Sequence, residues 1–361
     1  MAFNRFQPVL VASMLPLLVF AWFSRGVAGQ IDFWLLWLVA MTLVGLPLVF
    51  AEIALAHRSR TTPLVGLSTL TREADVATVW RGFGWLTVML LMVVVGHLLA
   101  SSADLLHPLL VTMATPALIA IMTLIVIGLS FTKHLAGWFA LILALVAMGF
   151  NMVHSGIVNW QMTASSLTEW SLAVVMALVC VGAGTGLLWH ARANQLLIQQ
   201  DTNDNKAVAS RYVIPVWSFQ IVAGALVAMV VNPLTQAAGI AYALAMLSGA
   251  AYLLHILTHQ VSLKLNQNSF NFLVLVIVAV ISLGLAMLPT FVLNQLMILL
   301  SLVAAIWLAV FAGWQMKISH VRKSMNFGSE AVYNLWRIAI RIIVPLAIVL
   351  ALIGWVMGLA K

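Results

Sequence analysis

The sequence predicts an all-α polytopic membrane protein with about eleven transmembrane helices. Of its 361 residues, 64% are hydrophobic and 7% are charged, whereas soluble proteins carry about 25% charged residues. The apolar runs are continuous over roughly 15 to 25 residues, the length that a membrane-spanning helix needs. They do not alternate between apolar and polar residues as the strands of an outer-membrane barrel do. We therefore expect a single helical membrane domain.

Eleven apolar runs are long enough to be spans. In chain order, they are Pro8–Phe23, Phe33–Ala56, Phe83–Leu106, Pro116–Phe131, Leu135–Val153, Leu172–Trp189, Tyr212–Val231, Ala238–Leu257, Phe272–Leu288, Phe291–Trp314 and Leu335–Leu359. The first run lacks a convincing small-residue cleavage site, so no cleavable signal peptide is expected.

The basic residues lie on one side of these spans. Of the 17 Lys and Arg residues, all but Arg25 and Lys361 fall on the side of the N-terminus. Because basic loops stay in the cytoplasm, this pattern predicts a cytoplasmic N-terminus and an external C-terminus in a bacterial-type inner membrane. The net charge of +8 is then a topology signal that also favours contacts with anionic membrane lipids. Nucleic acid is not an expected partner.

The connections between spans carry few signs of other functions. The longest cytoplasmic segments are His57–Gly82 and Arg192–Arg211, and the polar stretch Gln199–Asn205 in the second is predicted to be a loop. No Walker motif is present, and the single cysteine, Cys180, excludes an internal disulfide. No nucleophile–base pair or paired carboxylates are evident, so neither an enzyme nor a bound cofactor is expected.

Two spans contain residues that interrupt a helix. Gly182–Gly186 places three glycines in five residues of the sixth span, and Pro16 interrupts the first. Broken helices in corresponding places of two halves indicate a transporter binding site. The alternative is that Gly182 and Gly186 form a GxxxG motif, which allows two helices to pack closely.

Three groups of residues then suggest a family. They are Gly45–Glu52, Val181–Gly184 with Trp189 and Arg192, and Tyr333–Arg337 with Pro345. In this order they resemble the second, sixth and eleventh helices of the neurotransmitter:sodium symporters. The resemblance implies the leucine-transporter fold, with inverted repeats at about 8–153 and 172–314 and an extra helix at about 335–359. It also implies a central site between helices one, three, six and eight, and transport of amino acids or amines with sodium.

The chain departs from the family pattern at the sodium sites. Counting back from Gly45 without gaps, the family's sodium-binding asparagine of helix one falls at Leu17. In helix six, its sodium-binding threonine falls at Leu178. The substrate-site tyrosine of helix three falls at Val95, and Gly249 replaces a hydroxyl in helix eight. Sodium needs several hard oxygen ligands, which these side chains do not offer. The sodium sites are therefore expected to be degenerate, and sodium binding stays open.

The resemblance also selects candidate site residues. The substrate-binding candidates are Ser13, Met14, Val95, Cys180, Val181, Gly182, Gly184 and Ser248. The backbone amides of Val181 to Thr185 are expected to receive a solute carboxylate, aided by a helix dipole.

Two ionisable residues inside spans are candidates for coupling or for structure. Glu52 can carry a proton, cap the amides of the broken sixth helix, or lie at the membrane interface. His97 can titrate near cellular pH or pair with a neighbouring helix. His255 and His259 are one turn apart, but no acidic or cysteine residue nearby completes a metal site, so none is expected.

Two functions remain open from the sequence. The first is a secondary transporter for a small solute, an amino acid or amine, with altered coupling by a proton or none. The second is a non-transporting scaffold or accessory subunit, with a membrane-protein partner, that keeps the fold without the site.

Overall fold

The computed structural model describes residues 7–20, 23, 26–199, 209–231, 233–265 and 270–359. Seven of its helices are long and apolar enough to cross a membrane, and four shorter helices are also apolar. Each of them overlaps one of the predicted spans, and several extend beyond its predicted bounds. β structure among the described residues is limited to two isolated bridges, Gln30 with Gln161 and Ile157 with Val230. The chain is therefore a polytopic all-α membrane protein.

The first half contains five spans and one connecting helix. Its elements are α2 (Gln7–Leu15), η1 (Pro16–Phe20), α4 (Ile31–Ala40), η3 (Met41–Gly45), α5 (Leu46–Ser59), α6 (Pro63–Ala74), η4 (Thr78–Arg81), α7 (Gly82–Leu106), η5 (His107–Leu109), α8 (Thr115–Ser130) and α9 (His134–Ser155). The η1 and η3 segments are π-helical turns that continue α2 and join α4 to α5.

The second half contains the other six spans and one connecting helix, α16. Its elements are α10 (Leu167–Val181), α11 (Leu187–Gln199), α12 (Ala209–Ala228), α13 (Gln236–Lys264), α14 (Phe272–Ala286), α15 (Thr290–Val310), η6 (Phe311–Gln315), α16 (Ile318–Met325), α17 (Glu330–Ile338), η7 (Ala339–Ile343) and α18 (Val344–Leu359).

The sixth span begins and ends with strong local signals. Ser166 Oγ accepts the N–H of Glu169 at 3.2 Å, and the Glu169 carboxylate accepts the N–H of Ser166 at 2.7 Å. This capping box starts α10 by satisfying two amides that a helix leaves free. At its other end, Gly182 adopts a left-handed conformation, which stops a helix at little steric cost.

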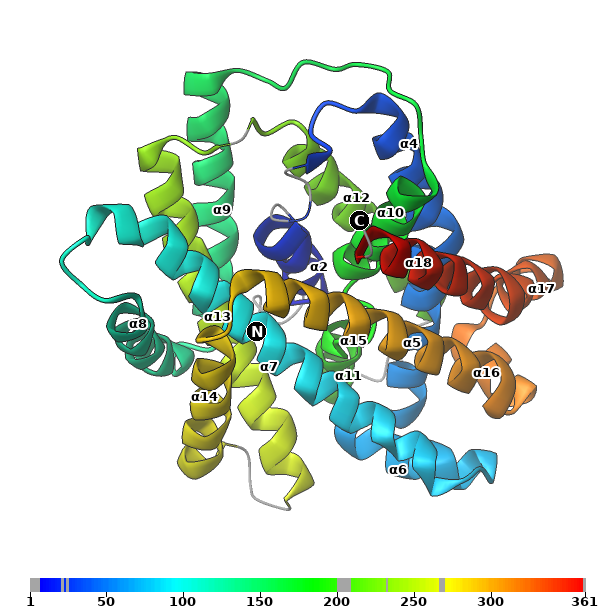
Figure 1. Cartoon of the computed structure of the whole chain (residues 1–361). Coiled ribbons are helices and arrows are strands. Elements are labelled where there is room, and N and C mark those ends of the chain that lie inside the picture. Colours follow the sequence, from blue (N-terminus) through cyan, green and yellow to red (C-terminus); the bar gives the residue numbers. More distant parts are fainter. Residues whose placement is uncertain are drawn as a thin grey trace.

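The long helices α7 and α13 form the centre of the packing. The α7 helix contacts α13, α14 and α15, while α13 also contacts α8 and α9. The broken helix α10 packs against α4 and α18. Figure 1 shows α2 in the middle of the assembly and α8 and α17 at its edges, while α18 runs inward from α17 towards α10. The π-helical turn η1 of the first span and the break in the sixth span therefore lie inside protein.

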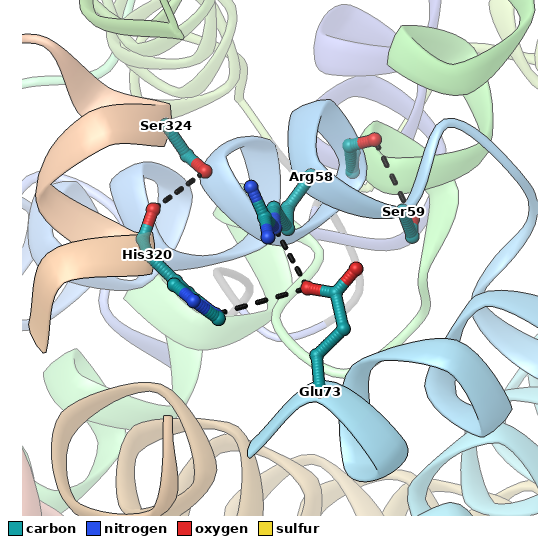
Figure 2. Close-up of polar contacts among 6 residues, drawn as sticks. Arg58, Ser59, Glu73, His320 and Ser324 are labelled. Atoms are coloured by element: carbon teal, nitrogen blue, oxygen red, sulfur yellow. Dashed lines mark hydrogen bonds and ion pairs between the residues drawn. The ribbon is translucent and has the colours of Figure 1, made fainter. Parts of the chain in front are cut away.

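The connecting helices α6 and α16 were not among the predicted elements. They meet at Glu73, whose carboxylate lies 2.7 Å from Arg58 Nε and 3.8 Å from His320 Nδ1, as Figure 2 shows. This contact joins the end of α5 to α6 and α16, all on the side predicted to be cytoplasmic.

The predicted cytoplasmic segment Arg192–Arg211 begins inside a helix rather than in a loop. The α11 helix continues to Gln199, and Arg192 is only 1% exposed. Its guanidinium lies 3.6 Å from the centre of the Tyr212 ring, a cation–π contact that stabilises a buried cation. The rest of the predicted polar loop, residues 200–205, lies outside the described residues.

Candidate functional site

The sixth span is broken between α10 and α11. Gly182, Gly184 and Gly186 have φ values of +66°, +78° and +67°, a region that side chains with a Cβ rarely adopt. The N–H groups of Gly182 and Ala183 donate to the carbonyls of Val179 and Leu178 at 3.0 and 2.9 Å. These bonds close the end of α10, so a solute carboxylate cannot use those two amides without displacing them.

Close packing also requires one of these glycines. A Cβ added at Gly184 would run into the Cβ of Ala304 on α15. The glycine cluster therefore serves both of the roles that the sequence left open: it breaks the helix and it brings two spans into close approach.

Glu52 fixes the second part of the broken helix. Its carboxylate is 1% exposed, and its Oε1 accepts the N–H of Trp189 at 3.1 Å. The indole of Trp189 donates to Ser59 Oγ at 3.1 Å and to the carbonyl of Thr61 at 2.9 Å. Because the first amides of a helix lack partners within it, Glu52 caps α11 and ties it to α5.

The first span is not unwound at Pro16, because α2 continues directly into the π-helical turn η1. A tyrosine donates to the carbonyls of this turn. The hydroxyl of Tyr242 on α13 donates to the carbonyls of Leu17 and Leu18 at 2.6 and 3.1 Å. On the same helix, a Cβ added at Gly249 would run into Leu18 Cδ1. The carbonyl oxygens of Leu17 and Leu18 in η1 thus face a hydroxyl donor, and the Leu18 side chain fills the space beside Gly249.

A small cavity lies where η1 and the end of α2 meet the break in the sixth span. Its volume is about 10 Å³, which is about the space for one water molecule. None of the described residues around it carries a charge, and Thr185 and Ser301 supply the hydroxyls. The lining residues are Leu15, Val19, Leu90, Val94, Leu178, Val179, Gly182, Ala183, Thr185, Met297 and Ser301.

Of the substrate-binding candidates, Gly182 lines this cavity. Ser13 Oγ donates to the carbonyl of Val9 on its own helix at 3.0 Å. Cys180 faces α12, with its Sγ 3.4 Å from the carbonyl of Gln220. The other five candidates are buried and do not line the cavity; they are Met14, Val95, Val181, Gly184 and Ser248.

Sequence reasoning missed most of the lining. Leu15, Val94 and Leu178 are apolar residues of apolar helices, and such residues carry no signal of which side faces a cavity. Met297 and Ser301 come from α15, the tenth span, for which no motif was recognised. The α13 helix, expected to contribute through Ser248, supplies no lining residue among those described.

The candidate histidines do not line this cavity. His97 on α7 is fully buried, with its Nε2 3.4 Å from Ser101 Oγ. The rings of His190 and His259 meet edge to face at 5.4 Å. Across the described ranges, no group of three or more metal-binding side chains comes together.

Tyr242→Phe is expected to lower the free energy of unfolding by ~2 kcal/mol. The substitution removes the hydroxyl that pairs with two buried carbonyls and leaves them unsatisfied. Thermal unfolding of the purified protein in detergent measures the loss.

Tyr252→Phe on the same helix is the matched control. The Tyr252 hydroxyl is also buried but receives one long hydrogen bond, from Gln7 at 3.4 Å. We expect a clearly smaller shift for this variant, and equal shifts for the two would contradict the role given to Tyr242.

The comparisons with known proteins identify the fold. No family model matches the sequence, and no curated protein matches it. The solved structure of MhsT in complex with L-phenylalanine superposes with a TM-score of 0.70 at 15% sequence identity. The alignment covers 97% of this chain and 98% of that one. The chain therefore has the leucine-transporter fold of that structure, as the sequence resemblance implied.

Proposed function

We propose that the protein is a sodium-independent transporter of a small, largely apolar solute, an amino acid with an apolar side chain or a related amine. The observation that supports this most is the apolar cavity where the π-helical turn of the first span meets the break in the sixth span. Binding sites of transporters lie at such breaks, and the similar structure of MhsT contains L-phenylalanine.

Solute entry requires a change of conformation. Small-molecule sites occupy roughly 300 to 1,000 Å³, far more than the cavity of about 10 Å³ seen here. In this proposal the structure corresponds to a closed state. The η1 turn and the Gly182–Gly186 segment then separate from α7 and α15 to admit the solute.

Two features favour independence from sodium. The Tyr242 hydroxyl directs its proton at the Leu17 and Leu18 carbonyls, and a cation beside those oxygens would meet a competing positive dipole. At the other family position, Leu178 offers an alkyl group where sodium needs oxygen. Solute transport is then coupled to a proton, with Glu52 and His97 as the candidate carriers, or it is uncoupled.

Uptake into proteoliposomes tests the transport function. Purified protein is reconstituted and given labelled leucine or phenylalanine, with and without a proton gradient. We expect solute to accumulate or equilibrate faster than in empty vesicles, without any need for sodium. Absence of uptake for every apolar amino acid and amine tried would contradict the proposal.

A pair of methionine variants controls for the site of transport. Met297 lines the cavity and is 1% exposed, so Met297→Phe is expected to fill the cavity and abolish uptake. Met287 is 43% exposed, and Met287→Phe is expected to leave uptake unchanged. Equal uptake by the two variants would place the solute elsewhere.

The small volume of the cavity favours one alternative, a scaffold or accessory subunit that holds a membrane-protein partner. A stoichiometric membrane partner that copurifies after mild solubilisation, together with absence of uptake, would support it. A monomer that is stabilised by solute would contradict it.

A further inference from the structure

We propose that a basic pocket at the start of the last span binds the headgroup of an anionic phospholipid. The pocket has a volume of about 360 Å³ and is lined by Trp314, Asn334, Arg337, Ile338, Arg341 and Ile342. It lies between η6, at the end of the tenth span, and the α17–η7 segment. The central cavity is formed by other residues, so this site is separate from the proposed transport site.

Two arginines give the pocket an uncompensated positive charge. Arg337 and Arg341 are four residues apart and line the same hollow. The ion pairs in the described part of the chain join other side chains, so neither arginine has an acidic partner there. Guanidinium groups in this arrangement bind phosphate oxygens with charge-assisted hydrogen bonds.

Local packing holds one of the arginines in place. Arg341 Nε donates to the carbonyl of Gly313, and its Cζ lies 5.0 Å from the centre of the Trp314 ring. These contacts use one face and one N–H of the guanidinium. The remaining donors of Arg341, with those of Arg337, are available to a ligand.

The surroundings favour a lipid over a soluble anion. The side chains of Ile338 and Ile342 in the pocket are 51% and 58% exposed, and Figure 1 shows α17 at the edge of the helix assembly. Along α18, the exposed side chains continue as Leu346, Val349 and Ile353. Trp314, 58% exposed, belongs to a residue type that favours the headgroup level of a membrane. A phosphodiester can therefore contact the arginines while its acyl chains follow the isoleucines.

The charge of the pocket selects among lipids. A zwitterionic phospholipid brings its own ammonium group, which two arginines without acidic partners would repel. A phospholipid with an uncharged polar headgroup, such as phosphatidylglycerol, keeps the net negative charge that this pocket fits. Each arginine near an anionic lipid contributes ~1 kcal/mol, which is about fivefold in affinity.

Native mass spectrometry of the delipidated full-length protein tests this inference. Phosphatidylglycerol or phosphatidylcholine is titrated into the detergent-solubilised protein, and bound lipid is counted. We expect phosphatidylglycerol to bind preferentially and Arg337→Gln to weaken that binding about fivefold. Equal binding of the two lipids, or unchanged binding by the variant, would overturn the assignment.

Two further variants and one competitor complete the experiment. Arg337→Lys keeps the charge and is expected to retain most of the binding. Arg322→Gln changes an exposed arginine that pairs with Glu330 outside this pocket and is expected to bind as the unmodified protein does. Displacement of the lipid by millimolar inorganic phosphate would identify a soluble-anion site and contradict the lipid assignment.

Discussion

Replacing Glu52 with alanine is expected to lower the free energy of unfolding by about 3 kcal/mol. The variant loses the carboxylate that accepts the N–H of Trp189, so this buried amide at the start of α11 has no partner. It also leaves a cavity between α5 and α11, because the Glu52 side chain of the unmodified protein is only 1% exposed. The midpoint of thermal unfolding, followed by size-exclusion chromatography of the heated protein, measures the loss.

Two variants show which property of Glu52 matters. Glu52→Gln keeps the size and a carbonyl acceptor, so we expect it to recover more than half of the lost stability. Glu330→Ala removes an exposed acid that pairs with Arg322, and exposed pairs contribute ~0–1 kcal/mol. A loss for Glu52→Ala no larger than that for Glu330→Ala would contradict the capping role.

Replacing Gly184 with alanine is expected to cost about 3 kcal/mol of stability. The alanine would have to adopt the left-handed backbone conformation of Gly184, with φ near +78°. Its Cβ would also run into Ala304. Either the Gly182–Gly186 segment or α15 must move, which disturbs the wall of the central cavity. The yield of monodisperse protein and its unfolding temperature report the effect.

Gly128→Ala is the matched control for this substitution. Gly128 lies inside α8, where an added Cβ meets nothing within 4 Å. Alanine is a better helix former than glycine, so this variant is expected to be neutral or more stable by ~0.5 kcal/mol. If Gly184→Ala were tolerated equally well, the close approach of the broken helix to α15 would be refuted.

The fold was largely predictable because membrane-spanning helices have a distinctive amino-acid composition. A lipid-facing helix must be apolar along its length, so all eleven spans stand out by hydropathy alone. Connecting helices carry no such constraint, and α6 and α16 were therefore missed. The burial of Arg192 was also missed, since its partner Tyr212 lies on another helix and only the tertiary structure brings the two together.

The candidate site was predictable only where it departs from a regular helix. The glycines at 182, 184 and 186 and the acid at 52 are unusual inside spans, and the structure brings them together at one break. The apolar lining was not predictable, because a leucine facing a cavity and one facing a neighbouring helix look alike in sequence. The hydrogen bond from Tyr242 to the Leu17 carbonyl in η1 joins residues 225 positions apart, and no local pattern indicates it.

The central claim is that this leucine-transporter fold binds an apolar solute without sodium. The most direct test is the unfolding temperature of the purified protein with saturating leucine or phenylalanine, in sodium chloride and in choline chloride. We predict that at least one of these solutes raises the unfolding temperature by the same amount in both salts. A rise that occurs only in sodium, or no rise with any apolar amino acid or amine, would contradict the account.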